Sequence, residues 1–159
     1  MVIPFRDSNG DIFAYQGRAF GKEKPKYITI RLDESVPKIF GLDRVDTSRD
    51  IFVVEGPIDS LFIPNCIAVA QSDLRVPQYK DKAVLVPDNE PRNREVIKQI
   101  EQAVDEGYRV VVWPDYVRQK DINDMILSGM DAPEIMELIH NNTLQGLTAK
   151  VALQTWKKI

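Results

Sequence analysis

The sequence has very few residues with soft metal-binding or redox-active side chains. Among its 159 residues, Cys66 is the only cysteine and His140 the only histidine. One cysteine excludes a disulfide framework and a zinc site built on paired cysteines, and one histidine argues against a histidine-based metal site or triad. Any metal ion must therefore be held by oxygen, which favours a hard cation such as Mg²⁺ or Mn²⁺. We expect Cys66 to be a small buried core residue.

Long apolar runs, repeats and low-complexity segments are also absent. No run approaches the roughly 20 apolar residues of a membrane-spanning helix, and residues 1–5 do not resemble a signal peptide. The sequence therefore predicts no membrane partner and a cytoplasmic location. Because 43% of the residues are hydrophobic, the chain is not wholly disordered. A length of 159 residues suits one compact domain, alone or with a small appendage.

The charge is distributed unevenly, although the net charge is only −3. Basic residues gather near the N-terminus, where the only acid among them is Glu23; they are Arg18, Lys22, Lys24, Lys26 and Arg31. Acids gather elsewhere, at 55–59, 88–95 and 121–137. A basic strip beside carboxylate clusters suits a metal-dependent enzyme that acts on a polyanion. Composition alone favours the alternative, in which these are solvated charges on loops.

The first 49 residues read as a small β-rich subdomain. Apolar and β-branched residues at 2–5, 12–15 and 27–32 predict strands, and Asn9-Gly10 predicts a hairpin turn between the first two. Residues 33–49 contain proline and glycine and predict a loop-rich connection. We place the boundary of the basic subdomain at residue 49.

From residue 50 onward the pattern is that of an α/β fold. Four short apolar runs at 51–54, 67–70, 83–86 and 110–113 predict buried parallel strands, and a helix that begins at Pro91 and ends at Gly107 separates the last two. Such a sheet is covered by helices on both faces. We assign residues 50–130 to this domain and residues 131–159 to a C-terminal helical segment.

Acidic groups follow several of these strands. The three groups are Glu55-Gly56-Pro57-Ile58-Asp59, Asp88-Asn89-Glu90, and Asp121-Ile122-Asn123-Asp124, which comes directly after Lys120. Parallel sheets bind ligands at the carboxyl ends of their strands, and carboxylates brought together there repel each other unless a cation neutralises them. Each group alone is more typical of helix capping than of a metal site, so the signal lies in the three together.

The order of these motifs resembles a Toprim domain, the catalytic fold of bacterial-type primases, topoisomerases and some nucleases. The segments 3–10, 16–18, 25–27 and 39–42 resemble the basic subdomain that precedes Toprim in primases, and the T-even phage type of DNA primase in particular. The resemblance covers roughly residues 1–130. It implies a DNA primase core that synthesises short RNA primers on single-stranded DNA with Mg²⁺ or Mn²⁺.

The resemblance also implies residue roles. Catalytic carboxylates would be Glu55, Asp88 and Glu90; metal ligands would be these three with Asp59 and Asp121; and nucleotide or DNA contacts would come from Arg18, Lys22, Lys24, Lys26 and Lys120. Two positions depart from the family pattern. Glu90 stands where the family has a second aspartate, and Asn123 stands where many relatives carry an acid, which leaves Asp124 as an ambiguous substitute.

Several alternatives stay open. The family's zinc-binding module is absent from this sequence, so we expect it on another chain or outside an excised core. Expected partners are template DNA, ribonucleoside triphosphates and a replicative helicase, in the host cytoplasm if the protein is phage-encoded. The rival functions are a Toprim nuclease or phosphodiesterase and a non-catalytic protein that binds single-stranded DNA or a helicase. We expect Trp113 in the core, whereas the helix after Gly146, with Trp156, suits either core packing or a partner contact.

Overall fold

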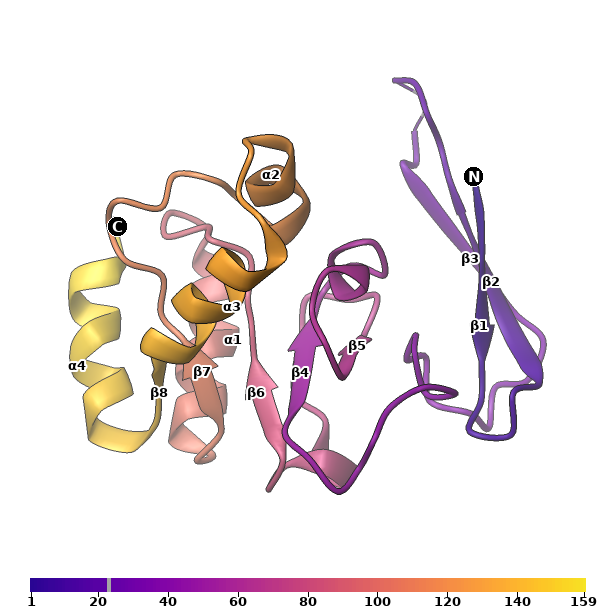
Figure 1. The fold of residues 1–159 in the computed structure, drawn as a ribbon, viewed down its shortest axis with the longest axis horizontal. Helices are drawn as coiled ribbons and strands as arrows, with labels where there is room; N and C mark the ends of the chain where they lie inside the picture. Colours follow the sequence, from indigo (N-terminus) through magenta and orange to yellow (C-terminus); the bar gives the residue numbers. More distant parts are fainter. Residues whose placement is uncertain (23) are drawn as a thin grey trace.

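The structure, a computed structural model, describes residues 1–22 and 24–159 (Figure 1). It contains two sheets. The first is an antiparallel sheet of order β1-β2-β3, built from β1 (Val2–Arg6), β2 (Ile12–Arg18) and β3 (Tyr27–Arg31). The second has the order β5-β4-β6-β7-β8, built from β4 (Ile51–Val54), β5 (Cys66–Ala68), β6 (Ala83–Leu85), β7 (Arg109–Val111) and β8 (Thr143–Leu144). The predicted α/β class with a preceding β-rich unit is confirmed.

The N-terminal sheet has a small core of its own. β1 and β2 form the predicted hairpin, and Gly10 adopts a φ of +89° in the turn, a conformation that favours glycine. On one face of this sheet, Phe5 and Phe13 are buried and pack edge to face with ring centroids 6.2 Å apart. Phe40, from the connection to the second sheet, packs on Phe5 and closes this core.

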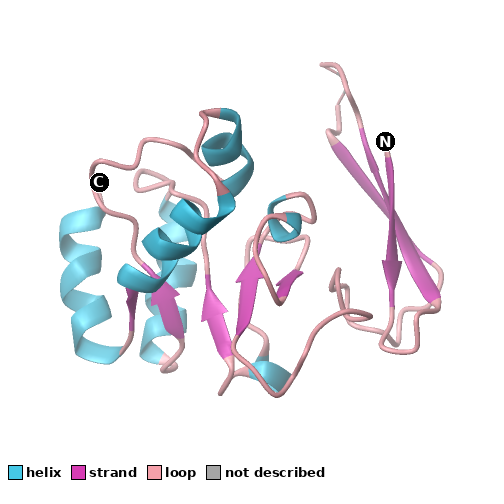
Figure 2. Cartoon of the chain, in the orientation of Figure 1, coloured by secondary structure: helices cyan, strands magenta, loops and turns pink. Residues whose placement is uncertain are grey.

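The second sheet is parallel except at one edge. β4 to β7 run parallel and are almost entirely buried, as their continuous apolar sequence predicts. The edge strand β8 pairs antiparallel with β7. Three helices, α1 (Arg94–Asp105), α3 (Ala132–Asn141) and α4 (Gly146–Trp156), cover the sheet together with the short α2 (Ile122–Leu127), and Figure 2 shows helices on both of its faces.

Three local features were not predicted from the sequence. The helix expected at Pro91 begins at Arg94, because the Asn93 side chain caps it by accepting hydrogen bonds from the N–H groups of Glu95 and Val96. After β4 the chain forms only the single 3₁₀ turn η1 (Asp59–Leu61), and a second 3₁₀ turn, η2 (Pro77–Tyr79), precedes β6. β8 was not predicted, because two residues are too few to show a period.

The C-terminal helices belong to the core of the second sheet. Ile135 and Ile139 of α3 are fully buried. α4 packs against α1 and buries Ala149, Leu153 and Trp156. Core packing of α4 is thus the alternative that the structure supports, although Leu147 and Val151 on its other side are exposed. No helix in the ranges 1–22 and 24–159 is long and apolar enough to cross a membrane.

Candidate active site

A cleft of about 540 Å³ lies between the two sheets, and chemically different side chains line its two walls. The wall from the N-terminal sheet carries Gln16, Lys26, Tyr27 and Thr29. The wall from the second sheet carries most of the predicted acids, and it consists of Glu55, Gly56, Pro57, Asp59, Ala70, Gln71, Ser72, Asp88, Lys120 and Asp121. The fold therefore brings four predicted carboxylates and one predicted lysine of the basic strip into one hollow.

Glu55 and Asp59 are placed by the end of β4 and the turn that follows it. Glu55 is the first residue beyond the strand, at its carboxyl end. A side chain at Gly56 would collide with Asp59, because a Cβ there would lie 2.5 Å from Asp59 Oδ2. Asp59 Oδ1 accepts a hydrogen bond of 2.9 Å from the backbone N–H of Asn123. Glycine at position 56 therefore allows Asp59 to reach the start of α2.

Asp88 and Glu90 follow β6 and share a lysine. Lys120 Nζ lies 3.4 Å from Asp88 Oδ2 and 3.4 Å from Glu90 Oε1. Asp88 lines the cleft, whereas Glu90 lines a neighbouring groove that also contains Arg92. The ammonium of Lys120 is thus paired with two carboxylates and neutralises part of their charge, and its predicted contact with nucleotide or DNA stays a prediction.

Asp121 caps a helix as well as lining the cleft. Its Oδ1 accepts a hydrogen bond of 2.7 Å from the N–H of Asp124 at the start of α2. This is the capping role that acids near helix starts commonly have. Asp124 is exposed and does not line the cleft. Of the two candidates for the missing second acid, Asn123 contributes a backbone N–H to Asp59, and Asp124 contributes one to Asp121.

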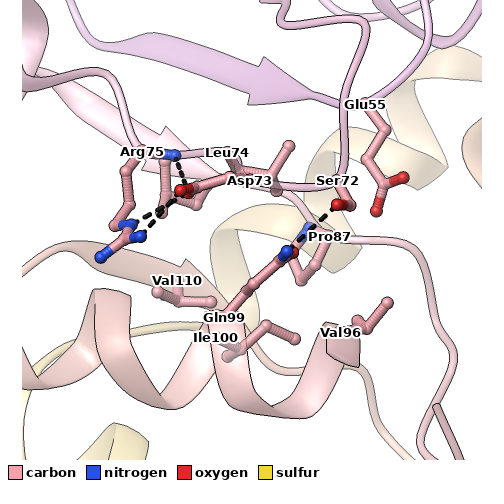
Figure 3. Close-up of a pocket in the computed structure, with 11 residues that line it drawn as sticks. Glu55, Ser72, Asp73, Leu74, Arg75, Pro87, Val96, Gln99, Ile100 and Val110 are labelled. Carbon is pink, nitrogen blue, oxygen red and sulfur yellow. Dashed lines mark hydrogen bonds and ion pairs between the residues drawn. The ribbon is translucent and has the colours of Figure 1, made fainter. Parts of the chain in front are cut away.

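Burial and mutual repulsion raise the pKa values of the central carboxylates. Glu55 reaches a pKa of about 8, because burial removes water and because Asp88 and Glu90 carry like charge nearby. Part of its surroundings is a small apolar pocket of about 10 Å³, close to the minimum for one water molecule, which lies against α1 (Figure 3). Burial likewise raises the pKa of Asp88 to about 6, although Lys120 opposes the rise.

Two further groups complete this electrostatic picture. Burial raises the pKa of Asp59, while its hydrogen bond from Asn123 acts in the opposite direction. Desolvation tends to lower the pKa of Lys120, but Asp88 and Glu90 outweigh that effect and the pKa is raised. Simultaneous ionisation of all the carboxylates in the cleft is therefore unfavourable, whereas the neighbouring Lys120 keeps its proton.

The oxygen-rich donor set fits a hard cation, although it is not a preformed cage. In the part of the chain that the structure describes, no three carboxylate, histidine or cysteine side chains lie close enough together to enclose a metal ion. Mg²⁺ retains several waters and is usually bound by one or two carboxylates together with substrate phosphates. Glu55 and Asp88, whose mutual repulsion a cation would relieve, are the side chains that fit this open mode of binding.

The predicted basic residues are divided between the cleft and its surroundings. Lys26 lines the cleft, and both Lys26 and Arg18 lie over the ring of Tyr27, with their charges 5.8 Å and 5.5 Å from its centroid. The charge of Arg18 opposes the rise in the pKa of Asp59 that burial causes. Lys22 and Lys24 are exposed on the loop between β2 and β3 and do not line the cleft, so their role stays a prediction.

Sequence reasoning missed several polar residues of this site. Gln16 and Thr29 lie opposite each other in the β2–β3 ladder and line the cleft, and Gln16 Nε2 is 3.3 Å from Thr29 Oγ1. The period of two in the strands was the available signal, because it places Gln16 on the same face as Arg18 and Thr29 on the same face as Tyr27. Asn89 was named only as the spacer between two acids.

Comparison with known proteins finds similarity to DNA primases in sequence and in fold. No family profile matches the sequence. The DNA primase of Enterobacteria phage T4 is 47% identical over 164 aligned residues, which cover 100% of this chain and 48% of the T4 protein. The chain thus spans about half the length of that relative.

Solved structures share the fold at low sequence identity. A DNA primase domain from Pseudomonas aeruginosa matches with a TM-score of 0.70 and 21% identity, over 94% of this chain and 53% of that one. A DnaG primase catalytic domain bound to single-stranded DNA matches with a TM-score of 0.68 and 17% identity, over 97% of this chain and 54% of that one. The chain is therefore a relative of the T-even phage DNA primase with the fold of the DnaG catalytic core, as its Toprim-like motifs predicted.

Proposed function

We propose that this chain is the catalytic core of a DNA primase, which joins ribonucleotides into short primers on a single-stranded DNA template with Mg²⁺ or Mn²⁺. The observation that carries the proposal is the cleft itself, in which Glu55, Asp59, Asp88 and Asp121 face Lys26 and Tyr27 of the other sheet. Phosphoryl transfer requires mainly positioning and neutralisation of charge, and these two walls supply both. The relationship to the T4 DNA primase supports the same activity.

The carboxylate wall would hold the metal ion. Glu55 and Asp88 are the nearest candidates for direct ligands, with Asp59, Glu90 and Asp121 around them. When bound, the cation would neutralise phosphate charge and polarise the reacting phosphate group. Glu55 fits two roles, because its carboxylate, once ionised, can either bind the cation or accept a proton from a 3′-hydroxyl group. Comparison of the pH–rate profiles of Glu55→Asp and Glu55→Gln separates ligand from base.

The basic wall would hold the phosphates. Lys26 lines the cleft opposite the carboxylates and can contact a triphosphate as a point charge, while Arg18 can supply a planar fork from the same side. Lys22 and Lys24, on the adjoining loop, would extend this positive surface toward a template strand. Lys120, already paired with Asp88 and Glu90, would release these carboxylates to the cation and then become available to a phosphate.

The basic wall also favours synthesis over the two rival functions. A Toprim nuclease needs the carboxylates but no triphosphate site, and a simple binding protein needs neither the buried acids nor their cost in stability. A solved relative of the same fold is a DnaG catalytic domain bound to single-stranded DNA, which supports the template as partner. A replicative helicase and a separate zinc-binding module remain further parts of the proposal, drawn from the family resemblance.

The decisive experiment is an incubation of the purified chain with labelled ribonucleoside triphosphates, unprimed or primed single-stranded DNA, and Mg²⁺ or Mn²⁺. Oligoribonucleotide products that disappear in Asp88→Ala and Lys26→Ala support the primase. If the DNA is degraded, and if this degradation is lost in Asp88→Ala but continues in Lys26→Ala, the result supports the nuclease. Binding of DNA without turnover supports the accessory protein. Adding a helicase and a zinc-binding module in trans tests whether the core needs them.

A further inference from the structure

The end of α4 holds the segment that carries Asp88 and Glu90. Trp156 Nε1 donates a hydrogen bond of 3.0 Å to Asn89 Oδ1. Two residues later, the backbone N–H of Lys158 donates a bond of 2.9 Å to the carbonyl oxygen of Pro91. These two contacts flank Glu90. We refer to Trp156 and Lys158 together as the C-terminal clamp.

Asn89 connects the clamp to a third segment. Its Nδ2 donates to the carbonyl oxygens of Val117 and Gln119, at 2.9 Å and 3.2 Å. Its backbone N–H donates to the carbonyl oxygen of Lys120 at 2.6 Å. The side-chain amide of Asn89 therefore makes hydrogen bonds at both its oxygen and its nitrogen, which fixes its rotamer. The loop with Asp88 and Glu90 is thereby tied to the segment that presents Lys120 and Asp121.

The indole of Trp156 is suited to impose this geometry. Trp156 is 5% exposed, and a buried indole N–H normally requires an acceptor. Asn89 Oδ1 is the acceptor in the structure. The ring itself is held by α4, whose Ala149 and Leu153 are buried where α4 packs on α1. The position of α4 thus sets the position of the indole, and the indole sets the orientation of Asn89.

We propose that Trp156 is a positioning residue for the carboxylate loop: through Asn89, it holds Asp88 and Glu90 where they can bind the cation. The inference rests on the proposed function, because it concerns the cation site assigned there. Groups that orient metal ligands without touching the metal commonly change metal affinity 10- to 100-fold when they are removed. We expect loss of the indole N–H to weaken cation binding about tenfold.

The test compares Trp156→Phe with Leu153→Val. Trp156→Phe keeps an aromatic ring and removes the donor to Asn89. Leu153→Val shortens another buried side chain of α4 and leaves the hydrogen bonds of the carboxylate loop unchanged. Free Mn²⁺ is measured by electron paramagnetic resonance in titrations of both variants and of the wild type, at a temperature where all three are folded. Tenfold weaker binding in Trp156→Phe alone supports the proposal, and equal affinity in the two variants overturns it.

Hydrogen exchange at the Asn89 amide provides the second readout. This amide is bonded to the Lys120 carbonyl, so it should exchange faster in Trp156→Phe than in Leu153→Val, and equal exchange overturns the proposal. If Trp156→Phe does not fold, Asn89→Ala, which removes the acceptor of the indole N–H together with the donor to Val117 and Gln119, replaces it in the Mn²⁺ titration. A wild type that binds no Mn²⁺ refutes the cation site of the proposed function, whereas a wild type that binds as tightly as Trp156→Phe refutes only the positioning role.

Discussion

Raising the pH should destabilise the cation-free protein, and Glu55 should be the main cause. Its pKa is about 8 in the folded state, against 4.5 for an ordinary glutamate. Between these two values the folded protein retains a proton that the unfolded chain has lost, so the free energy of unfolding falls as the pH rises from about 4.5 to 8. Asp88, with a pKa of about 6, adds a smaller decrease at the lower end of this range.

The size of the effect follows from the same values. At about 1.4 kcal/mol for each pH unit, the Glu55 difference corresponds to roughly 5 kcal/mol as an upper bound. Water in the open cleft and the Lys120 ammonium screen the charge, so we expect about 2 kcal/mol. In a domain of this size that decrease lowers the melting temperature by about 4–8 °C.

Glu55→Gln isolates this contribution, because glutamine has nearly the same shape and does not titrate. In urea unfolding with EDTA present, wild type and variant should have similar stability near pH 5, and the variant should be more stable by about 2 kcal/mol at pH 8.5. Glu95→Gln, an exposed glutamate at the start of α1, is the matched control and should follow the wild type. Parallel pH profiles for wild type and Glu55→Gln would refute the reasoning.

Four further predictions concern other parts of the site and fold. Millimolar Mg²⁺ or Mn²⁺ should raise the melting temperature of the wild type. An equal rise in Asp88→Ala would show that Asp88 is not part of the cation site. Lys26→Ala should weaken binding of single-stranded DNA and reduce the slope of log affinity against log salt concentration by about 0.7. An unchanged slope would show that Lys26 does not contact a phosphate. Gly56→Ala should cost about 1–3 kcal/mol in chemical unfolding, because its Cβ would meet the Asp59 carboxylate, and a neutral result contradicts that contact. Truncation before Gly146 should produce a protein that unfolds or aggregates in thermal melts, since α4 is part of the core, whereas an unchanged melting temperature would assign the helix to a partner.

The sheet and the position of the acids were predictable because both depend on local rules. A run of four apolar residues such as 51–54 must be buried on both faces, and a residue directly after a parallel strand lies at its carboxyl edge. These two rules place Glu55 and Asp88 in the cleft without knowledge of any long-range contact. The helix boundaries were less certain, because the cap at Asn93 depends on one side chain and not on a period.

The contacts that define the site were not predictable, because they join residues that are distant in the sequence. Trp156 and Asn89 are 67 residues apart, and no pattern in either segment indicates that they meet. The pairing of Lys120 with Asp88 and Glu90 depends on where a long, flexible side chain settles among charges. The short β8 escapes detection for a different reason, since two residues define no alternation.

The two sheets have distinct clusters of buried residues, and Phe40 and Leu42 pack against both. Phe5, Phe13 and Ala14 pack beneath the basic wall, and a different, larger cluster supports the carboxylate wall. The bridge between Phe40 and Ala68 is a backbone pairing through which the connecting segment also joins the edge of the second sheet. Substitutions in one wall that spare Phe40 and Leu42 can therefore accumulate while the packing that orients the other wall stays intact. A fold organised in this way can keep one set of carboxylates and acquire new substrates by rebuilding only the surface opposite them.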